Sequence, residues 1–185
     1  RQTCICYLIG VMFLEKGEWY IEQYFATNFQ EEAEVLQAFL DKTRSFDCLI
    51  SFNGDGFDIP FIKARMDRWK ISSSLSVPSV DILKILRKGN FDLPVPNLKL
   101  KTLEQFAGVY RQDQYSGGDL IGMYFRYVKS KEESLKQNIL LHNFEDIENM
   151  LILDKIMYMA TGNDSEKSVG KKQLRLQRFS ISGSD

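Results

Sequence analysis

The feature that most constrains the fold is a glycine-rich step in the middle of the chain. Residues 47–52 (DCLISF) form a short apolar run typical of a strand, and residues 53–56 (NGDG) end it. Residues 57–69 then return to helical spacing, with Asp58 at the start of the expected helix. Glycines let the backbone turn sharply off the end of a strand. This strand–loop–helix step therefore predicts an α/β domain in which Asp58 lies at a sheet edge.

The segments on either side extend the same pattern. Residues 4–14 and 19–27 are rich in β-forming residues around a turn at residues 15–18, which predicts a hairpin. Residues 77–86 indicate a short strand that runs into a helix. Helical spacing predicts further helices over residues 29–42, 99–108, 120–128 and 131–159. Early strands followed by late helices predict a mixed sheet flanked by helices.

Length and composition favour one domain, which we place over residues 1–161. The chain has 185 residues, of which 44% are hydrophobic, and this is enough for one sizeable core. Residues 162–185 are polar and basic, and we expect either a tail or an added edge strand there. The formal charge is −1, so any binding of nucleic acid must use a local basic patch.

Cysteine and histidine usage excludes other classes of protein. The chain has three cysteines, which cannot build a disulfide framework, and this predicts a reducing cytoplasm. One histidine and no Cys-x-x-Cys pair argue against structural zinc, so a metal would be held by oxygen. No apolar run is long enough to span a membrane.

Two local patterns carry candidate chemistry. In the first, Asp58 opens the helix that follows the glycine-rich loop; the alternative is that it merely caps this helix. In the second, His142 and Asp146 lie four residues apart and therefore share one face of the late helix. The alternative for this second pattern is an ordinary surface pair at helical spacing.

Taken in order, these motifs resemble the DEDD exonuclease superfamily and, within it, the YprB-like ribonuclease-H-like domains. Residues 52–61 with Arg65 resemble the second motif of that family, with Asp58 as its metal-binding acid. His142, Asn143 and Asp146 resemble the third motif, at the spacing of Tyr-type members and with His in the Tyr place. The stretches between them resemble the family's intervening segments, namely residues 81–87 (DILKILR), residues 98–104 (LKLKTLE) with Gly108 and Arg111, and Ser116-Gly117.

The resemblance implies a ribonuclease-H-like fold and 3′–5′ exonuclease-type hydrolysis of DNA or RNA, single-stranded in our expectation, by two divalent cations. Oxygen ligands select Mg²⁺ or Mn²⁺. Asp58 and Asp146 would be metal ligands, and His142 would orient or deprotonate the attacking water. Supporting roles fall to Asn53, which would position the loop, and to Asp81, for which the alternative is a helix start. Lys99, Lys101 and Arg111 are candidates to contact phosphates, the alternative being a solvated basic face.

One departure from the family pattern shapes these expectations. The family's first motif, an Asp-x-Glu pair on the strand before a Tyr-Leu-Ile-Gly strand, has no counterpart, because Tyr7–Gly10 already matches the second strand. Truncation and natural loss are both open; Arg1 as first residue favours truncation. We therefore expect a sheet without its first strand, in which residues 173–181 could substitute, and little or no nuclease activity in this chain. The rival functions are a non-catalytic nucleic-acid-binding or scaffolding module and, with less support, a nucleotide-binding domain.

Overall fold

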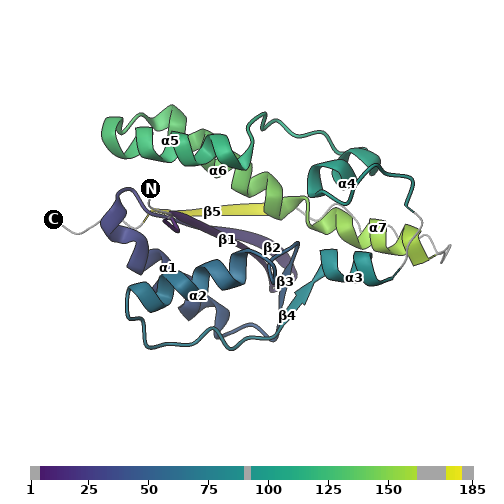
Figure 1. Cartoon of the computed structure of the whole chain (residues 1–185), viewed down its shortest axis with the longest axis horizontal. Coiled ribbons are helices and arrows are strands. Elements are labelled where there is room, and N and C mark those ends of the chain that lie inside the picture. Colours follow the sequence, from purple (N-terminus) through teal and green to yellow (C-terminus); the bar gives the residue numbers. More distant parts are fainter. Residues whose placement is uncertain (1–4, 90–92, 162–173, 181–185) are drawn as a thin grey trace.

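The fold begins with a β-hairpin. The computed structural model describes residues 5–89, 93–161 and 174–180 (Figure 1). β1 (Leu8–Glu15) and β2 (Glu18–Phe25) pair antiparallel over their full length, around a turn at Lys16 and Gly17. Both turn residues have positive φ, which is the backbone geometry that a tight hairpin turn requires. The predicted hairpin is therefore confirmed.

The remaining strands complete two small sheets. β5 (Leu174–Ser180) pairs parallel with β2, giving the order β1-β2-β5. β3 (Leu49–Ser51) and β4 (Ser79–Asp81) form a separate parallel pair. The expected mixed α/β architecture is confirmed, although the strands divide between two sheets. β5 joins the hairpin at β2 and not at β1, and the rest of the expected tail, residues 162–173 and 181–185, lies outside the described residues.

Helices cover both faces of the hairpin sheet (Figure 1). On one face lie α1 (Glu32–Thr43), which follows the short 3₁₀ helix Phe29–Glu31, and α2 (Asp58–Arg68). On the other lie α5 (Gly117–Ser130) and α6 (Glu133–Glu148). At one end of the molecule are α3 (Ile82–Lys88), α4 (Leu100–Phe106) and α7 (Leu151–Thr161). No helix in the described part of the chain is long and apolar enough to cross a membrane.

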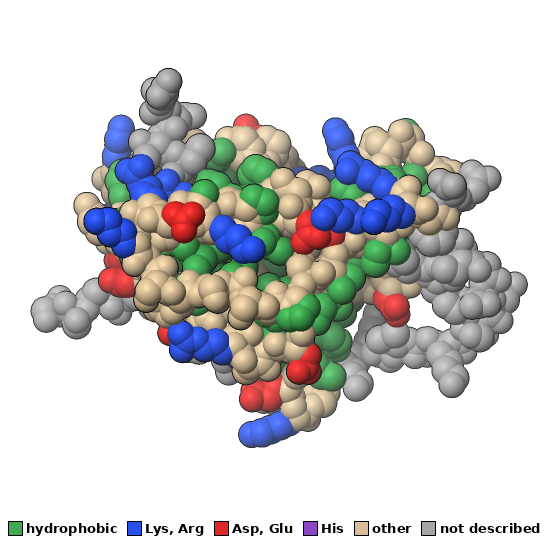
Figure 2. All heavy atoms as spheres, turned by 60° about the horizontal axis from the view of Figure 1, so that its bottom comes forward, with side chains coloured by type: hydrophobic (Ala, Val, Ile, Leu, Met, Phe, Trp, Pro, Cys, Tyr) green, Lys and Arg blue, Asp and Glu red, His purple; other side chains and the backbone are tan. Residues whose placement is uncertain are grey.

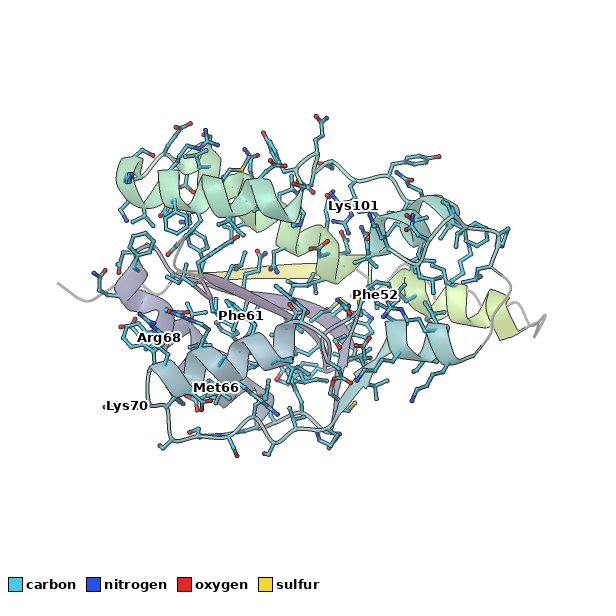
Figure 3. All side chains as sticks on the ribbon, viewed as in Figure 1. Phe52, Phe61, Met66, Arg68, Lys70 and Lys101 are labelled. Carbon is cyan, nitrogen blue, oxygen red and sulfur yellow. The ribbon has the colours of Figure 1, made fainter. Side chains whose placement is uncertain are left out.

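Each group of helices has its own hydrophobic cluster. Alternate β1 residues Ile9 and Val11 pack with α1 and with Met66 of α2, which Figure 3 shows beneath the sheet. Phe25 of β2 packs with the buried faces of α5 and α6. Leu103 of α4 packs with α3 and α7. The sheet is thus held between two apolar layers, and the third cluster fixes the end of the molecule.

The prediction of one helix over residues 131–159 is wrong. Lys131 has φ 56° and ends α5, so that α6 begins only at Glu133. α6 then ends at Glu148, and the backbone N–H of the C-cap residue Asn149 donates to carbonyls in the last turn. The physical reason for the break is packing, because α6 belongs to the cluster over the hairpin whereas Leu153 and Ile156 of α7 are buried against α4.

The sheet and α6 approach each other closely at Gly10 of β1. A Cβ atom built on Gly10 would lie 2.1 Å from Ile147 Cδ1 and 2.3 Å from Asn143 Oδ1. Asn143 Oδ1 also accepts a hydrogen bond from the buried Gln23 Nε2 at 2.9 Å. Only glycine leaves room for α6 at this distance from the sheet.

We expect Gly10→Ala to lower the free energy of unfolding by about 1–3 kcal/mol, because the added methyl group must displace α6 side chains. Gly122→Ala is the matched control, since a Cβ at that exposed helical position meets nothing within 4 Å, and it should be neutral or stabilising by up to about 1 kcal/mol. Urea denaturation of both variants checks this. Equal stabilities of Gly10→Ala and the wild type would contradict the close-packing argument.

Candidate active site

Asp81 organises the glycine-rich loop. Its buried carboxylate caps α3 by accepting from the backbone N–H groups of Leu83 at 3.0 Å and Lys84 at 3.4 Å. It also accepts from the N–H groups of Asn53 at 2.9 Å and Asp55 at 3.2 Å. Asp81 therefore starts a helix and supports the loop at the same time, and these two interpretations do not exclude each other.

Asn53 shapes the same loop with its backbone. It has φ 65°, a left-handed conformation that Asn tolerates better than most residues, and its carbonyl accepts from the N–H groups of Gly56 and Phe57. The chain thereby turns from β3 into α2 within a few residues. Asn53 itself is exposed, so its side chain is accessible from solvent.

Asp58 is the first residue of α2, at the end of this loop. The N-cap position is Phe57, so Asp58 is not a capping residue in the usual sense. Desolvation by the surrounding protein, reinforced by the charges of Asp146 and Asp81, raises the pKa of Asp58 to about 6. The side chain of Asp58 is still exposed to solvent, so its pKa is raised by partial desolvation and neighbouring negative charges and not by complete burial. No Lys or Arg in the described ranges pairs with it.

His142 and Asp146 lie on the face of α6 that is turned toward the site. His142 Nε2 is 3.3 Å from Asp146 Oδ2, and the other ring nitrogen, Nδ1, is 2.6 Å from Asp113 Oδ2. His142 is buried, so the pair is not an ordinary surface pair. Desolvation lowers the pKa of His142, but hydrogen bonds and charges from Asp146 and Asp113 outweigh it and leave the pKa raised. His142 is therefore held between two carboxylates.

Arg111 joins Asp146 to the interior of the protein. Its Nε and Nη2 donate to the two carboxylate oxygens of Glu104, each at 2.5 Å, and its Nη1 donates to Asp146 Oδ1 at 2.5 Å. Glu104 is completely buried. Burial acts to raise the pKa of Asp146, but His142 and Arg111 overcome this and hold it below its ordinary value. Arg111, which we expected to contact phosphate, is engaged with two carboxylates of the protein.

The two lysines of the expected basic patch differ. Lys101 belongs to the first turn of α4 (Figure 3), and its Nζ donates to the carbonyl of Tyr115 at 2.8 Å and to Asp113 Oδ2 at 3.2 Å. Lys99 is exposed at the start of α4. Figure 2 shows another face of the molecule, where Lys and Arg side chains are interspersed with acidic and apolar ones. Nothing on that face forms a continuous basic surface.

The carboxylates of this site suit one hard cation. Asp58 has no basic partner among the residues that the structure describes, and the side chain of Asp146 is 38% exposed. Mg²⁺ is commonly bound by one or two carboxylates and keeps several waters, which matches this donor set. Among the residues that the structure describes, however, no group of three or more His, Cys, Asp or Glu could hold a metal. The described residues therefore offer Asp58 and Asp146 as carboxylate donors and do not supply ligands for two cations.

Three acidic residues around this site were not among the site residues predicted from the sequence motifs. Glu104 pairs with Arg111, Asp113 contacts His142, and Glu145 accepts from the backbone N–H groups of residues 112 and 113. Glu104 lay inside a quoted motif, but neither its burial nor its partner followed from that motif. A possible signal was the spacing of Arg111 and Asp113, two apart in an extended segment and thus able to reach the same neighbouring helix.

Comparisons with known proteins agree with this architecture. The sequence model of a family described as the RNase_H superfamily matches residues 1–158. A 68-residue segment is 31% identical to the DNA polymerase of Autographa californica nuclear polyhedrosis virus, covering 36% of this chain and 7% of that protein. A 52-residue segment is 42% identical to the DNA polymerase of Ostreid herpesvirus 1 (isolate France), covering 27% of this chain and 3% of that protein. The chain thus spans a small part of the length of these relatives. No solved structure matches it.

We expect Arg111→Met to destabilise the fold by about 3–5 kcal/mol, because it leaves the buried Glu104 carboxylate without a cation. The double variant Arg111→Met/Glu104→Met should recover much of that loss, since it removes both charges. Chemical denaturation of the two variants and the wild type measures this coupling. If the double variant were as unstable as the single one, the loss would come from packing and not from the unpaired charge.

The raised pKa of Asp58 predicts a pH-dependent stability with a definite sign. An unfolded Asp titrates near 3.9, so a folded pKa of about 6 means that ionisation of Asp58 disfavours the fold. This destabilisation is absent below about pH 4 and complete above about pH 6. Without divalent cations, Asp58→Asn should therefore raise the melting temperature at about pH 7.5 and have less effect as the pH falls toward 4. Asp67→Asn, an exposed change on the same helix, should follow the wild-type curve; parallel curves for Asp58→Asn would contradict the shift.

Proposed function

Because the chain belongs to the ribonuclease H superfamily, we propose that its domain is a metal-dependent nuclease that removes nucleotides from the 3′ end of single-stranded DNA or RNA. Superfamily membership supports a nuclease-type function in general and a divalent cation as its usual cofactor. The 3′–5′ polarity and a place among the YprB-like members of the DEDD group are the finer parts of the proposal. They rest on the second and third motifs, around Asp58 and around His142 and Asp146.

The observations that support the proposal are the effect of the Asp146 charge on Asp58 and the contact between Asp146 and His142. The chain separates Asp58 from Asp146 by more than half of the domain, yet the charge of Asp146 raises the pKa of Asp58. His142 contacts Asp146 directly. Carboxylates and an imidazole are the groups that metal-assisted phosphodiester hydrolysis uses.

Each of these residues has a definite task in the proposed reaction. A bound Mg²⁺ or Mn²⁺ would supply Lewis-acid stabilisation of the phosphate, held by Asp58 and Asp146. Asp58 has no competing basic partner in the described residues, whereas Asp146 is also oriented by Arg111. His142 would accept a proton from the attacking water through Nε2, the nitrogen that faces Asp146. Asp81 and Asn53 hold the loop that places Asp58.

The comparisons favour nucleic acid as the substrate. The viral relatives that share segments with this chain are named DNA polymerases, and these enzymes act on nucleic acid. Lys99, the exposed N-cap residue of α4, is accessible to a phosphate. We further propose that residues 1–161 constitute the nuclease domain and that it works in the cytoplasm, where its cysteines stay reduced.

A non-catalytic nucleic-acid-binding module is the second candidate, and one observation favours it. The described residues offer two carboxylates for a metal and no cluster of three, and Arg111 already neutralises one of the two. Such a site could bind a nucleic acid end without cleaving it. Activity measurements decide between the two functions.

The test is a cleavage assay of the full natural polypeptide with Mg²⁺ or Mn²⁺ on 5′-labelled single-stranded DNA and RNA. A 3′–5′ exonuclease should shorten both labelled strands from the 3′ end and leave circular DNA intact. Asp58→Asn and Asp146→Asn should each lower kcat at least 100-fold, because an amide is a poor metal ligand of similar shape. His142→Ala should lower kcat by roughly 10²–10⁴-fold.

Asp67→Asn is the control, since this exposed residue of α2 lies outside the site. Wild-type rates in Asp58→Asn or Asp146→Asn would remove those residues from the site. Binding of single strands without any cleavage would reject the nuclease and leave the binding module.

A further inference from the structure

The loop between α4 and α5 places a buried carboxylate directly behind His142. Asp113 Oδ2 lies 2.6 Å from His142 Nδ1, the nitrogen on the opposite side of the ring from Asp146. The Asp113 side chain is 1% exposed, so water does not compete for this contact. None of the sequence motifs assigned a role to Asp113.

The carboxylate of Asp113 is fixed before any substrate arrives. Its Oδ1 accepts from the backbone N–H of Tyr115 at 3.0 Å, and its Oδ2 also accepts from Lys101 Nζ at 3.2 Å. Lys101 in turn donates to the carbonyl of Tyr115 at 2.8 Å, which closes a small ring of bonds. With several donors directed at it, Asp113 is an ionised acceptor and not a donor.

α6 holds the same loop at a second point. Glu145, one turn after His142, accepts from the backbone N–H groups of Gln112 at 2.8 Å and Asp113 at 2.9 Å. Glu145 is buried. Glu145 and His142 both belong to α6, so one helix holds the backbone of the loop and also carries the imidazole. The distance between Asp113 and His142 is therefore fixed by α6.

This geometry decides which ring nitrogen carries the proton. A carboxylate only accepts hydrogen bonds, so the nitrogen at 2.6 Å from it must be protonated. The contact of Nε2 with Asp146 is longer, at 3.3 Å, and that carboxylate is partly open to solvent. The short contact therefore dominates, and the neutral ring has its hydrogen on Nδ1 and its lone pair on Nε2.

We infer that Asp113 is a positioning residue, which keeps the hydrogen of the neutral His142 ring on Nδ1 and leaves Nε2, beside Asp146, as the nitrogen that takes up a proton. The inference rests on the proposed nuclease function only for its kinetic consequence. In that reaction the water loses its proton to Nε2 as its oxygen attacks phosphorus, and the bond from phosphorus to the leaving oxygen breaks. The leaving oxygen takes up a proton from solvent water, and the imidazolium afterwards returns its proton to solvent. The Nδ1–H bond to Asp113 stabilises the imidazolium that results.

The first test is spectroscopic and does not require activity. The chain contains one histidine, so ¹⁵N-histidine labelling gives the signals of a single ring. In the neutral form, the wild type should show a protonated Nδ1 and an unprotonated Nε2. Asp113→Asn should shift the ring toward the Nε2–H tautomer, because an amide N–H can donate to Nδ1. A wild-type ring with its hydrogen on Nε2 would overturn the inference.

The second test is kinetic, in the full natural polypeptide. Asp113→Asn should lower kcat on the order of 10²–10⁴-fold while KM changes less than about twofold, because Asp113 does not touch the substrate. Asp113→Glu should recover part of kcat. If Asp113→Asn folds poorly, Asp113→Glu is the variant whose kcat is compared with that of the wild type. Asp119→Asn weakens the capping box of α5 in the next turn of chain without reaching His142, and it should keep the wild-type kcat.

The outcomes separate the two proposals. Loss of kcat in Asp119→Asn equal to that in Asp113→Asn would show that Asp113 is merely structural, and would overturn the inference. An unchanged tautomer and an unchanged kcat in Asp113→Asn would overturn it as well. An inactive wild type whose tautomer nevertheless changes in Asp113→Asn would reject the nuclease function and leave the positioning role intact.

Discussion

The site depends on the buried guanidinium of Arg111. This group satisfies the completely buried Glu104 of α4 with two hydrogen bonds and reaches Asp146 of α6 with a third. An unpaired carboxylate at the Glu104 position would be costly, so α4, the following loop and α6 must stay together. The face of α6 that bears His142 and Asp146 is fixed by the same constraint. A planar guanidinium suits this task because it binds one carboxylate with two atoms and still has donors for another.

Around this anchor the charges are distributed unequally. Asp146 lies beside Arg111 and His142, which keep it ionised, whereas Asp58 has negative neighbours and no basic partner among the described residues. The local field therefore favours a positive charge next to Asp58. Perturbed carboxylates of this kind concentrate at functional sites, because the fold alone gains nothing from them. This asymmetry agrees with the proposal that a cation binds at Asp58 and Asp146.

Secondary structure could be read from the sequence where local rules dominate. The hairpin of β1 and β2 and the step from β3 to α2 follow from β-forming runs and from turn residues. The break between α6 and α7 could not be read, because residues 131–159 keep a helical spacing throughout. It depends on which cluster each half packs against, and this is a property of the assembled fold. The same holds for β5, whose partner β2 lies about 150 residues earlier in the chain.

The sequence by itself determined the α/β class, the glycine-rich turn before Asp58 and the shared helical face of His142 and Asp146. These features follow from periodicity and backbone freedom, which act over a few residues. Only the tertiary structure decided that Arg111 is bound to Glu104 and Asp146, that Lys101 is tied to Asp113 and that Asp113 holds the imidazole of His142. The reason is that hydrogen bonds and ion pairs depend on distances between segments far apart in the chain. A local pattern can show which side chains are able to ionise, but not which partner each will meet after folding.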